Sequence, residues 1–254
     1  MAGAVPSWLT AAFVLEEGFA IDELRDIVAD MAAAASASGV QIVSGDTKVV
    51  PKGAADGMFI TTAGVGVVPL GRELSPALVR PGDKVLVSGT IGDHGMAVML
   101  ARGDLAIEAD IASDTAAVSP LVQHLLAVAP STRWMRDPTR GGVGTVCNEL
   151  AQACGLAVVL EEDRLPVRPA VSGACEMLGI DPLYVANEGK FLAVVDPAEA
   201  ADALSALRSQ PGGQDAAEIG HIAGEPAATV VVRTAFGGTR IVDMLVGDPL
   251  PRIC

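Results

Sequence analysis

Helix-like and strand-like stretches alternate along the chain, and this alternation limits the fold more than any other feature. Residues 22–38 carry apolar side chains at helical spacing, with Asp22 as the expected N-cap and Gly39 as the end of the helix. Further helices are expected at residues 96–101, 115–128, 143–154, 168–178 and 197–208. Strands are expected at residues 40–43, 58–68, 84–88, 156–160, 191–195, 218–222, 229–233 and 240–245. Because some strands follow one another without a helix between them, the pattern predicts an α+β fold of mixed α/β layers.

The core must be built from small aliphatic side chains, because 50% of the residues are hydrophobic but only 3% are aromatic. Such side chains suit tightly packed α/β layers. A chain of 254 residues is long enough for two domains, and the polar sequence LVRPGD at residues 78–83 is typical of a boundary. We therefore expect a first domain at residues 1–80, a second at 81–235, and a strand with a tail at 236–254.

The formal net charge of −14 argues against a protein that binds nucleic acid, because such proteins need a positive surface. An acidic protein can hold a nucleotide through Mg²⁺, although the charge can also serve solubility alone. No stretch reaches the roughly 20 apolar residues of a membrane helix, and the first residues have no basic segment typical of a signal peptide. We therefore expect a soluble, cytoplasmic protein without membrane contact.

The last eight residues, GDPLPRIC, differ from the rest of the chain. Pro249 and Pro251 disfavour both helix and sheet, so an extended and mobile tail of up to about 25 Å is expected. Cys254 ends this tail, and a thiol at the tip of a mobile arm suits the delivery of a bound group. The other cysteines, Cys147, Cys154 and Cys175, lie in helical patterns and are expected in the core.

Several polar turns carry residues suited to phosphate chemistry. Asp46 follows an expected strand as part of a polar turn, where a carboxylate can bind Mg²⁺, and Lys48 points to the same side if the chain is extended. Asp93 and His94 occupy a glycine-rich turn before a helix, a place that favours phosphate, although His94 can equally be a capping or packing residue. An ordinary turn remains the alternative for Asp46.

A second polar turn, at residues 136–142, also precedes a helix. Asp137, Thr139 and Arg140 lie in it, next to Gly141, which allows close backbone approach. Nucleotide binding and a simple capped Asp-Pro turn are both compatible with this pattern.

Six segments together resemble the HypE family of hydrogenase expression/formation proteins. They are residues 44–49 (SGDTKV), 88–95 (SGTIGDHG), 136–144 (RDPTRGGVG), 161–167 (EEDRLPV), 183–190 (LYVANEGK) and 251–254 (PRIC). The first three resemble motifs of the wider PurM-like superfamily of ATP-using enzymes, and the terminal PRIC distinguishes HypE. The resemblance implies a PurM-like two-domain architecture, here with a truncated first domain and an extended C-terminal tail, and a homodimer.

The resemblance also implies a reaction. A HypF-type carbamoyltransferase would load a carbamoyl group on Cys254, ATP with Mg²⁺ would drive its dehydration to a thiocyanate, and the cyano group would pass to iron on a HypC–HypD-type complex. The resemblance implies catalytic roles for Cys254, Lys48 and Glu188, and a metal-binding role for Asp46. The residues expected at the nucleotide are Asp46, Thr47, Asp93, His94, Asp137, Thr139, Arg140, Gly141 and Asn187. A surface turn is the alternative for Glu188.

Two other functions remain compatible with the sequence. The chain can be another PurM-like enzyme that uses ATP on a small molecule, in which case Cys254 would be dispensable for turnover. It can also be a non-catalytic fragment that binds partners or carries a group on its thiol, in which case it would not bind ATP.

Overall fold

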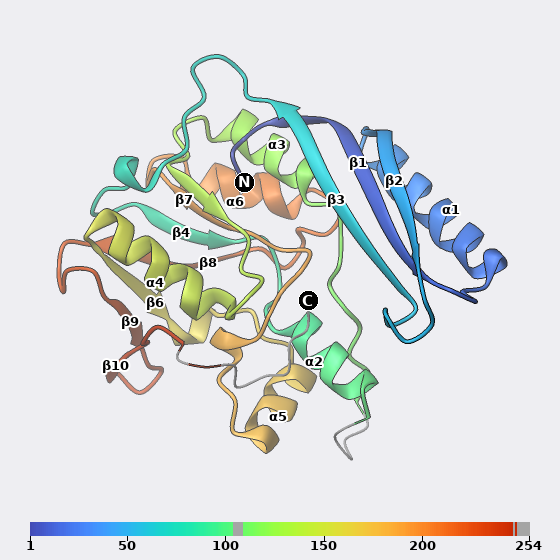
Figure 1. The fold of residues 1–254 in the computed structure, drawn as a ribbon. Coiled ribbons are helices and arrows are strands. Elements are labelled where there is room, and N and C mark those ends of the chain that lie inside the picture. Colours follow the sequence, from blue (N-terminus) through green and yellow to red (C-terminus); the bar gives the residue numbers. More distant parts are fainter. Residues whose placement is uncertain (104–108, 246, 248–254) are drawn as a thin grey trace. The chain divides into compact units, whose positions relative to one another are not determined.

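The computed structural model describes residues 1–103, 109–245 and 247, so Cys254 and its tail lie outside the described residues. The chain divides into two compact units (Figure 1). The small unit is Ala4–Gly71, and the large unit joins Met1–Gly3 to the described residues from Arg72 onward. Both units contain helices and sheets, which confirms the predicted mixed α/β fold class.

The small unit is a three-stranded sheet with one helix. Its elements are β1 (Val5–Glu16), α1 (Ile21–Ala37), β2 (Gln41–Val50) and β3 (Met58–Val67). The central strand β1 is parallel to β2 and antiparallel to β3. A parallel pair requires a crossover connection, and α1 provides it.

Side-chain alternation separates two faces of this small sheet. Leu15 of β1 is buried, and its neighbour Val14 points to the opposite face of the sheet. Val14 pairs in register with Lys48, and Asp46 lies two residues before Lys48 on β2. The side chains of Asp46 and Lys48 therefore share the face opposite Leu15. Thr47, between them, points to the same face as Leu15.

The predicted short buried strand at residues 40–43 and the polar turn after it were wrong. β2 runs without a break from Gln41 to Val50, and nearly all of its residues are exposed. Its backbone pairs with β1 over almost its whole length, so the polar sequence does not end the strand. β1 was not predicted, although it is the strand on which the other two assemble.

The start of α1 was also predicted wrongly. The N-cap position is Ala20, which provides no side-chain hydrogen bond, and Asp22 lies within the first turn. There Asp22 forms an exposed ion pair of 2.7 Å with Arg25. An acidic side chain in the first turn still complements the helix dipole, so the sequence signal was displaced rather than absent.

The large unit contains a seven-stranded sheet in the order β10-β9-β6-β8-β4-β7-β5. Its strands are β4 (Lys84–Val87), β5 (Trp134–Arg136), β6 (Ala157–Glu161), β7 (Leu192–Val195), β8 (Ala217–Ala223), β9 (Val230–Arg233) and β10 (Thr239–Ile241). All neighbouring strands are antiparallel except β6 and β9. The three-residue strand β5 is too short to show a pattern and was not predicted.

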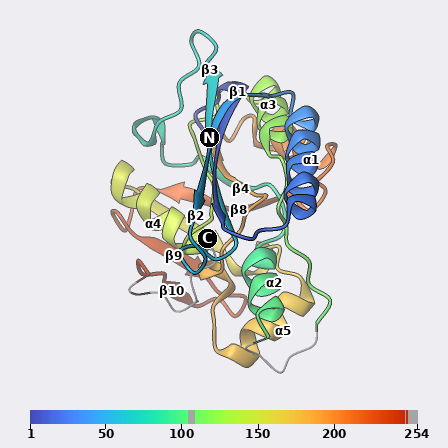
Figure 2. The same cartoon turned by 45° about the vertical axis from the view of Figure 1, so that its right-hand side comes forward.

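Helices cover both faces of the large sheet (Figures 1 and 2). They are α2 (Asp93–Ala101), α3 (Ser119–Val128), α4 (Gly142–Cys154), α5 (Pro169–Leu178) and α6 (Ala200–Arg208). Val85 and Val87 of β4 pack in one core with α4, and Leu86 between them packs in a second core with α3 and α6. A third, smaller core joins α2 to α5, which lie side by side in both views.

Three predicted helices begin at other residues, and the one expected at 197–208 begins at Ala200. The helix expected at 115–128 begins at Ser119, with Pro120 in its first turn, and residues 109–118 form neither helix nor strand. The helix expected at 96–101 begins already at Asp93, because Gly92 takes up the left-handed conformation, with φ of 86°, at the N-cap position. Asp93 and His94 therefore belong to the first turn of α2.

Candidate functional site

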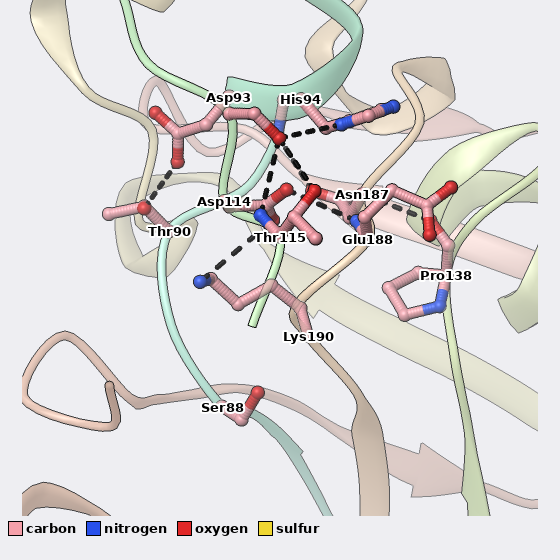
Figure 3. A network of polar contacts seen from close by, with 12 residues as sticks. Ser88, Thr90, Asp93, His94, Asp114, Thr115, Pro138, Asn187, Glu188 and Lys190 are labelled. Atoms are coloured by element: carbon pink, nitrogen blue, oxygen red, sulfur yellow. Dashed lines mark hydrogen bonds and ion pairs between the residues drawn. The ribbon is translucent and has the colours of Figure 1, made fainter. Parts of the chain in front are cut away.

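Asn187 joins three loops of the large unit (Figure 3). Its Oδ1 accepts a hydrogen bond of 2.8 Å from the Gly92 N–H, and its Nδ2 donates to the carbonyls of Pro138 and Val185, both at 3.0 Å. The side chain is fully buried. We call residues 88–95, 136–142 and 185–190, which Asn187 ties together, the loop cluster. Five of the six motifs that carried the resemblance lie in the large unit or the tail, and three of them form this cluster.

Asp93 fixes the start of α2 within the loop cluster. Its side chain is 1% exposed, and its Oδ2 accepts a short hydrogen bond from the Thr90 hydroxyl. Arg168 places its Nε 3.6 Å from Oδ1, which has no hydrogen-bond partner in the part of the chain that the structure describes. The carboxylate therefore faces the protein, and its negative charge lies at the positive end of the α2 dipole.

His94 follows in the same helical turn and connects α2 to the segment before α3. Its Nδ1 lies 2.9 Å from the Ser113 Oγ, which lies 2.8 Å from the Thr115 Oγ1. The imidazole is partly exposed. This contact is a local hydrogen-bonded chain between α2 and residues 113–115, so one of the two ring nitrogens is already engaged.

Glu188 follows the buried Asn187, and its side chain is partly exposed. Its backbone N–H donates to the Asp114 Oδ1 at 3.1 Å. The Asp114 Oδ2 forms an ion pair of 3.8 Å with the Nζ of Lys190. The backbone of Glu188 is thus fixed on both sides, while its carboxylate can reach solvent or a substrate.

A cavity of about 320 Å³ lies at the N-terminus of α4. Its walls are formed by Arg136, Asp137, Thr139, Arg140, Val146 and Glu149. The Thr139 hydroxyl donates to the Asp137 carboxylate at 3.1 Å, and Arg136 and Glu149 form an ion pair of 3.8 Å. Arg140 and the positive end of the α4 dipole suit an anionic group, whereas Arg136 is paired with Glu149 and Asp137 adds negative charge to the same walls.

Gly141 and Gly142 allow α4 to begin close to the loop cluster. Both have positive φ angles, of 70° and 62°. A side chain on Gly142 would collide with the backbone carbonyls of Leu183 and Val185. Glycine is therefore required here, both for the left-handed conformation and for the close approach of two loops.

The predicted site residues fall into three groups. Asp93, His94, Asp137, Thr139, Arg140, Gly141, Asn187 and Glu188 lie in the large unit. Asp46, Thr47 and Lys48 lie on β2 of the small unit, and Cys254 lies outside the described residues. Within the described part of the chain, no three His, Cys, Asp or Glu side chains gather in a way that would hold a metal ion.

Two buried charged residues of the site were not assigned a role from the sequence. Lys190 stood in a segment that signalled the resemblance, so the motif itself could have pointed to it. Asp114 gave no such signal, because the stretch around it was predicted to begin a helix. Only the fold brings Asp114 against Glu188 and Lys190.

Comparison with known proteins places this arrangement in a family. Residues 1–68 match the N-terminal domain and residues 80–233 the C-terminal domain of the AIR synthase related protein family. The carbamoyl dehydratase HypE of Rhodobacter capsulatus is 56% identical over 252 residues, which cover 99% of this chain and 74% of the relative. The chain belongs to the HypE family.

Two solved HypE structures agree with this membership. A hydrogenase maturation protein HypE in complex with ATP is 43% identical, with a TM-score of 0.94, covering 100% of this chain and 77% of that chain. A HypE–HypF complex is 46% identical, with a TM-score of 0.92, covering 96% of this chain and 79% of that chain. The predicted HypE resemblance is confirmed. No helix among the described residues has the length and hydropathy needed to span a bilayer.

Proposed function

We propose that this HypE family member uses ATP to dehydrate a carbamoyl group on Cys254 to a thiocyanate. The thiocyanate then supplies cyanide ligands for the iron of a nickel–iron hydrogenase. The similarity to carbamoyl dehydratases along the whole chain carries this proposal. It is joined by Cys254, which stands in the sequence PRIC at residues 251–254. ATP is present in one of the similar HypE structures, which supports its use here.

The chemistry requires phosphorylation and deprotonation at one carboxamide. The thiocarbamate oxygen attacks the γ-phosphorus of ATP, ADP leaves, and one N–H proton is lost. The C–O bond then breaks, phosphate takes the oxygen, and loss of the second N–H proton leaves the C≡N triple bond on sulfur. The protein must therefore supply a base near the nitrogen and positive charge near the transferred phosphoryl group.

Glu188 is our proposed base. Its backbone is held by the Asp114 carboxylate, and its neighbour Asn187 is fixed by three side-chain hydrogen bonds. A base held on a rigid loop needs little reorganisation before it takes a proton. Its partly exposed carboxylate remains available to a substrate carried by a moving tail.

Lys48 and Asp46 are proposed to act from the small unit. They project from the same face of β2, so one can neutralise phosphate charge while the other binds a cation. Mg²⁺ commonly uses one or two protein carboxylates with phosphate and water for its remaining positions, so a single Asp46 carboxylate fits that donor set. Thr47 points to the opposite face, and we propose that it contributes through its backbone.

The remaining proposed nucleotide residues gather at the starts of two helices of the large unit. Arg140, Thr139 and Gly141 line or border the α4 cavity, where an anionic group would meet positive charge. The Asp137 carboxylate accepts a hydrogen bond from the Thr139 hydroxyl and orients that hydroxyl. Asp93, His94 and Asn187 shape the neighbouring loops, and we propose that they support nucleotide binding by fixing those loops.

The proposed partners follow the reaction. A HypF-type carbamoyltransferase loads Cys254, and the HypE–HypF complex among the similar structures supports this partner. A HypC–HypD-type complex receives the cyano group, and the chain acts as a homodimer in the cytoplasm. We further propose that residues 1–80 and 81–235 form the two domains, followed at 236–254 by a strand and a tail that ends in the carrier cysteine.

Mass spectrometry tests the function directly. The chain is incubated with a carbamoyl donor and the transferase, and Mg-ATP is then added. The C-terminal peptide should gain a carbamoyl group and then lose the mass of one water, and Cys254→Ala should do neither. A carbamoylated peptide that keeps its mass in the presence of Mg-ATP would contradict the proposal.

A further inference from the structure

Asp114 is a buried carboxylate in a segment that has no regular secondary structure. Its side chain is 4% exposed, and residues 109–118 around it form neither helix nor strand. Burial of a carboxylate is unfavourable unless charge and hydrogen bonds compensate for it. Within residues 1–103, 109–245 and 247, the compensating groups come from residues 188–190 of the loop cluster (Figure 3).

The two oxygens of Asp114 have separate partners. Oδ1 accepts the backbone N–H of Glu188 at 3.1 Å, and Oδ2 faces the ammonium group of Lys190 at 3.8 Å. Oδ2 is buried and has no hydrogen-bond partner among the described residues, so the Lys190 charge is its compensation there. One carboxylate thus fixes the positions on both sides of Gly189.

The close packing of this region shows that the contact is built into the fold. A side chain on Gly189 would collide with the Asp114 carbonyl, and it would lie 2.8 Å from the Ala116 nitrogen. The Lys190 stem passes so close to Gly89 that a Cβ there would lie 2.8 Å from its Cε. Lys190 is only 11% exposed and is therefore directed along one path toward Asp114.

We propose that Asp114 is a positioning residue for Glu188, an inference that rests on the proposed function. Asp114 fixes the Glu188 backbone by accepting a hydrogen bond from its N–H. It also neutralises the charge of Lys190, which lies two residues after Glu188. Without the Asp114 charge, the Lys190 ammonium would lose its counter-ion, and the loop that carries Glu188 would lose the ion pair that fixes it on one side of Gly189. Among the described residues the Glu188 carboxylate has no ion pair in the intact arrangement.

The test is the rate of water loss in a single turnover. Full-length protein is carbamoylated by the transferase, excess Mg-ATP is added, and intact mass is followed over time. Asp114→Asn should slow water loss about 10-fold to 100-fold, the scale expected for a small misplacement of a catalytic group. The ATP concentration for half-maximal rate should change less than about twofold, because Asp114 acts on the base rather than on nucleotide binding.

Asp83→Asn is the matched control. Asp83 is another buried carboxylate of the large unit, 2% exposed, which accepts a backbone N–H from Arg80 at 2.8 Å and pairs with Arg133 at 3.5 Å. Its partners lie outside the loop cluster. The substitution should change the melting temperature but leave the rate of water loss unchanged. A rate loss equal to that of Asp114→Asn would overturn the proposal, because it would mean a general effect of removing a buried charge.

A double-mutant cycle separates positioning from mere stability. If Asp114 acts through Glu188, then Asp114→Asn in a Glu188→Gln background should slow the residual reaction by less than about twofold. If the two substitutions slow water loss independently, so that their rate effects multiply, the positioning role of Asp114 is overturned and the proposed base is not. A wild-type rate for Asp114→Asn would have the same meaning. A wild-type rate for Glu188→Gln would instead overturn the proposed base, and the positioning role with it.

A second variant covers a failure of Asp114→Asn to fold. Asp114→Asn combined with Lys190→Met removes both charges of the buried pair, which is often tolerated when removal of one is not. The Met side chain keeps the apolar contact with Gly89. This double variant should show the same slow water loss and the same lack of additivity with Glu188→Gln, and a wild-type rate would overturn the proposal.

Discussion

Replacement of Asn187 by Leu should destabilise the large unit strongly, because Asn187 satisfies buried backbone groups from three loops. Leu has a similar size but no hydrogen-bonding group. The Gly92 N–H and the Val185 carbonyl would lose their Asn187 partner. The Pro138 carbonyl would keep the hydrogen bond of 3.1 Å that it accepts from the backbone N–H of residue 187. Two stranded groups at about 1–3 kcal/mol each predict a loss of about 2–6 kcal/mol.

The assay is denaturant unfolding followed by tryptophan fluorescence. The chain has two tryptophans, and Trp134 is buried in the large unit whereas Trp8 is on the small unit. Measurements in a Trp8→Phe background therefore report on the large unit. A decrease of less than about 1 kcal/mol in the free energy of unfolding for Asn187→Leu would refute the reasoning, since a single backbone group left without a hydrogen bond should cost at least about 1 kcal/mol.

Asn148→Leu is the matched comparison for this prediction. Asn148 is also a buried asparagine of the large unit, and its Nδ2 donates to the carbonyls of Gly144 and Val242, both at 2.9 Å. Gly144 lies in α4 four residues earlier, so its carbonyl is the normal helical acceptor and stays paired. One stranded carbonyl, of Val242, predicts a smaller loss of about 1–3 kcal/mol.

Two further predictions concern backbone conformation and pH. Gly142→Ala should lower the free energy of unfolding by about 2–4 kcal/mol, because φ is 62° and the new methyl group meets two carbonyls. Gly173→Ala, in open space within α5, should raise it by about 0.5–1 kcal/mol in the same unfolding assay. Burial, with the Arg233 charge, lowers the pKa of His221 below its usual 6.5, so the folded protein binds this proton more weakly than the unfolded chain. His221 therefore contributes stability that is present above about pH 6.5 and is lost as pH falls through the lowered pKa, and His221→Gln should flatten the fall of melting temperature on acidification. An equally steep fall in the variant would contradict this assignment.

The elements with a strong apolar pattern were predictable from the sequence. β4 and β7 are buried between helices on both faces, and their apolar runs follow from that burial. β2 was predicted wrongly because its polar central residues 44–48 pair with β1 although they are exposed. Local sequence cannot report a pairing with partner residues that lie 33 or 34 positions earlier, as in Trp8 with Gln41 and Glu16 with Val50.

The site was predictable only as separate motifs. Asn187, Gly92 and Pro138 lie far apart in sequence and meet through hydrogen bonds that only the folded sheet brings together. Asp114 illustrates what the motifs leave out, since its role depends on contacts with residues 74 and more positions away. The assignments of Lys48, Glu188 and the nucleotide residues remain predictions, and Cys254 lies outside the described residues.

The fate of one oxygen atom tests the central claim most directly. The chain is loaded with a carbamoyl group carrying oxygen-18 at its carbonyl, and Mg-ATP is added. Burial raises the pKa of the Cys147 thiol to about 12 and of the Cys175 thiol to about 11, so loading should be confined to Cys254 among these three. The account predicts that the heavy oxygen appears in inorganic phosphate as the C-terminal peptide becomes a thiocyanate. Heavy oxygen in water, with unlabelled phosphate, would contradict it.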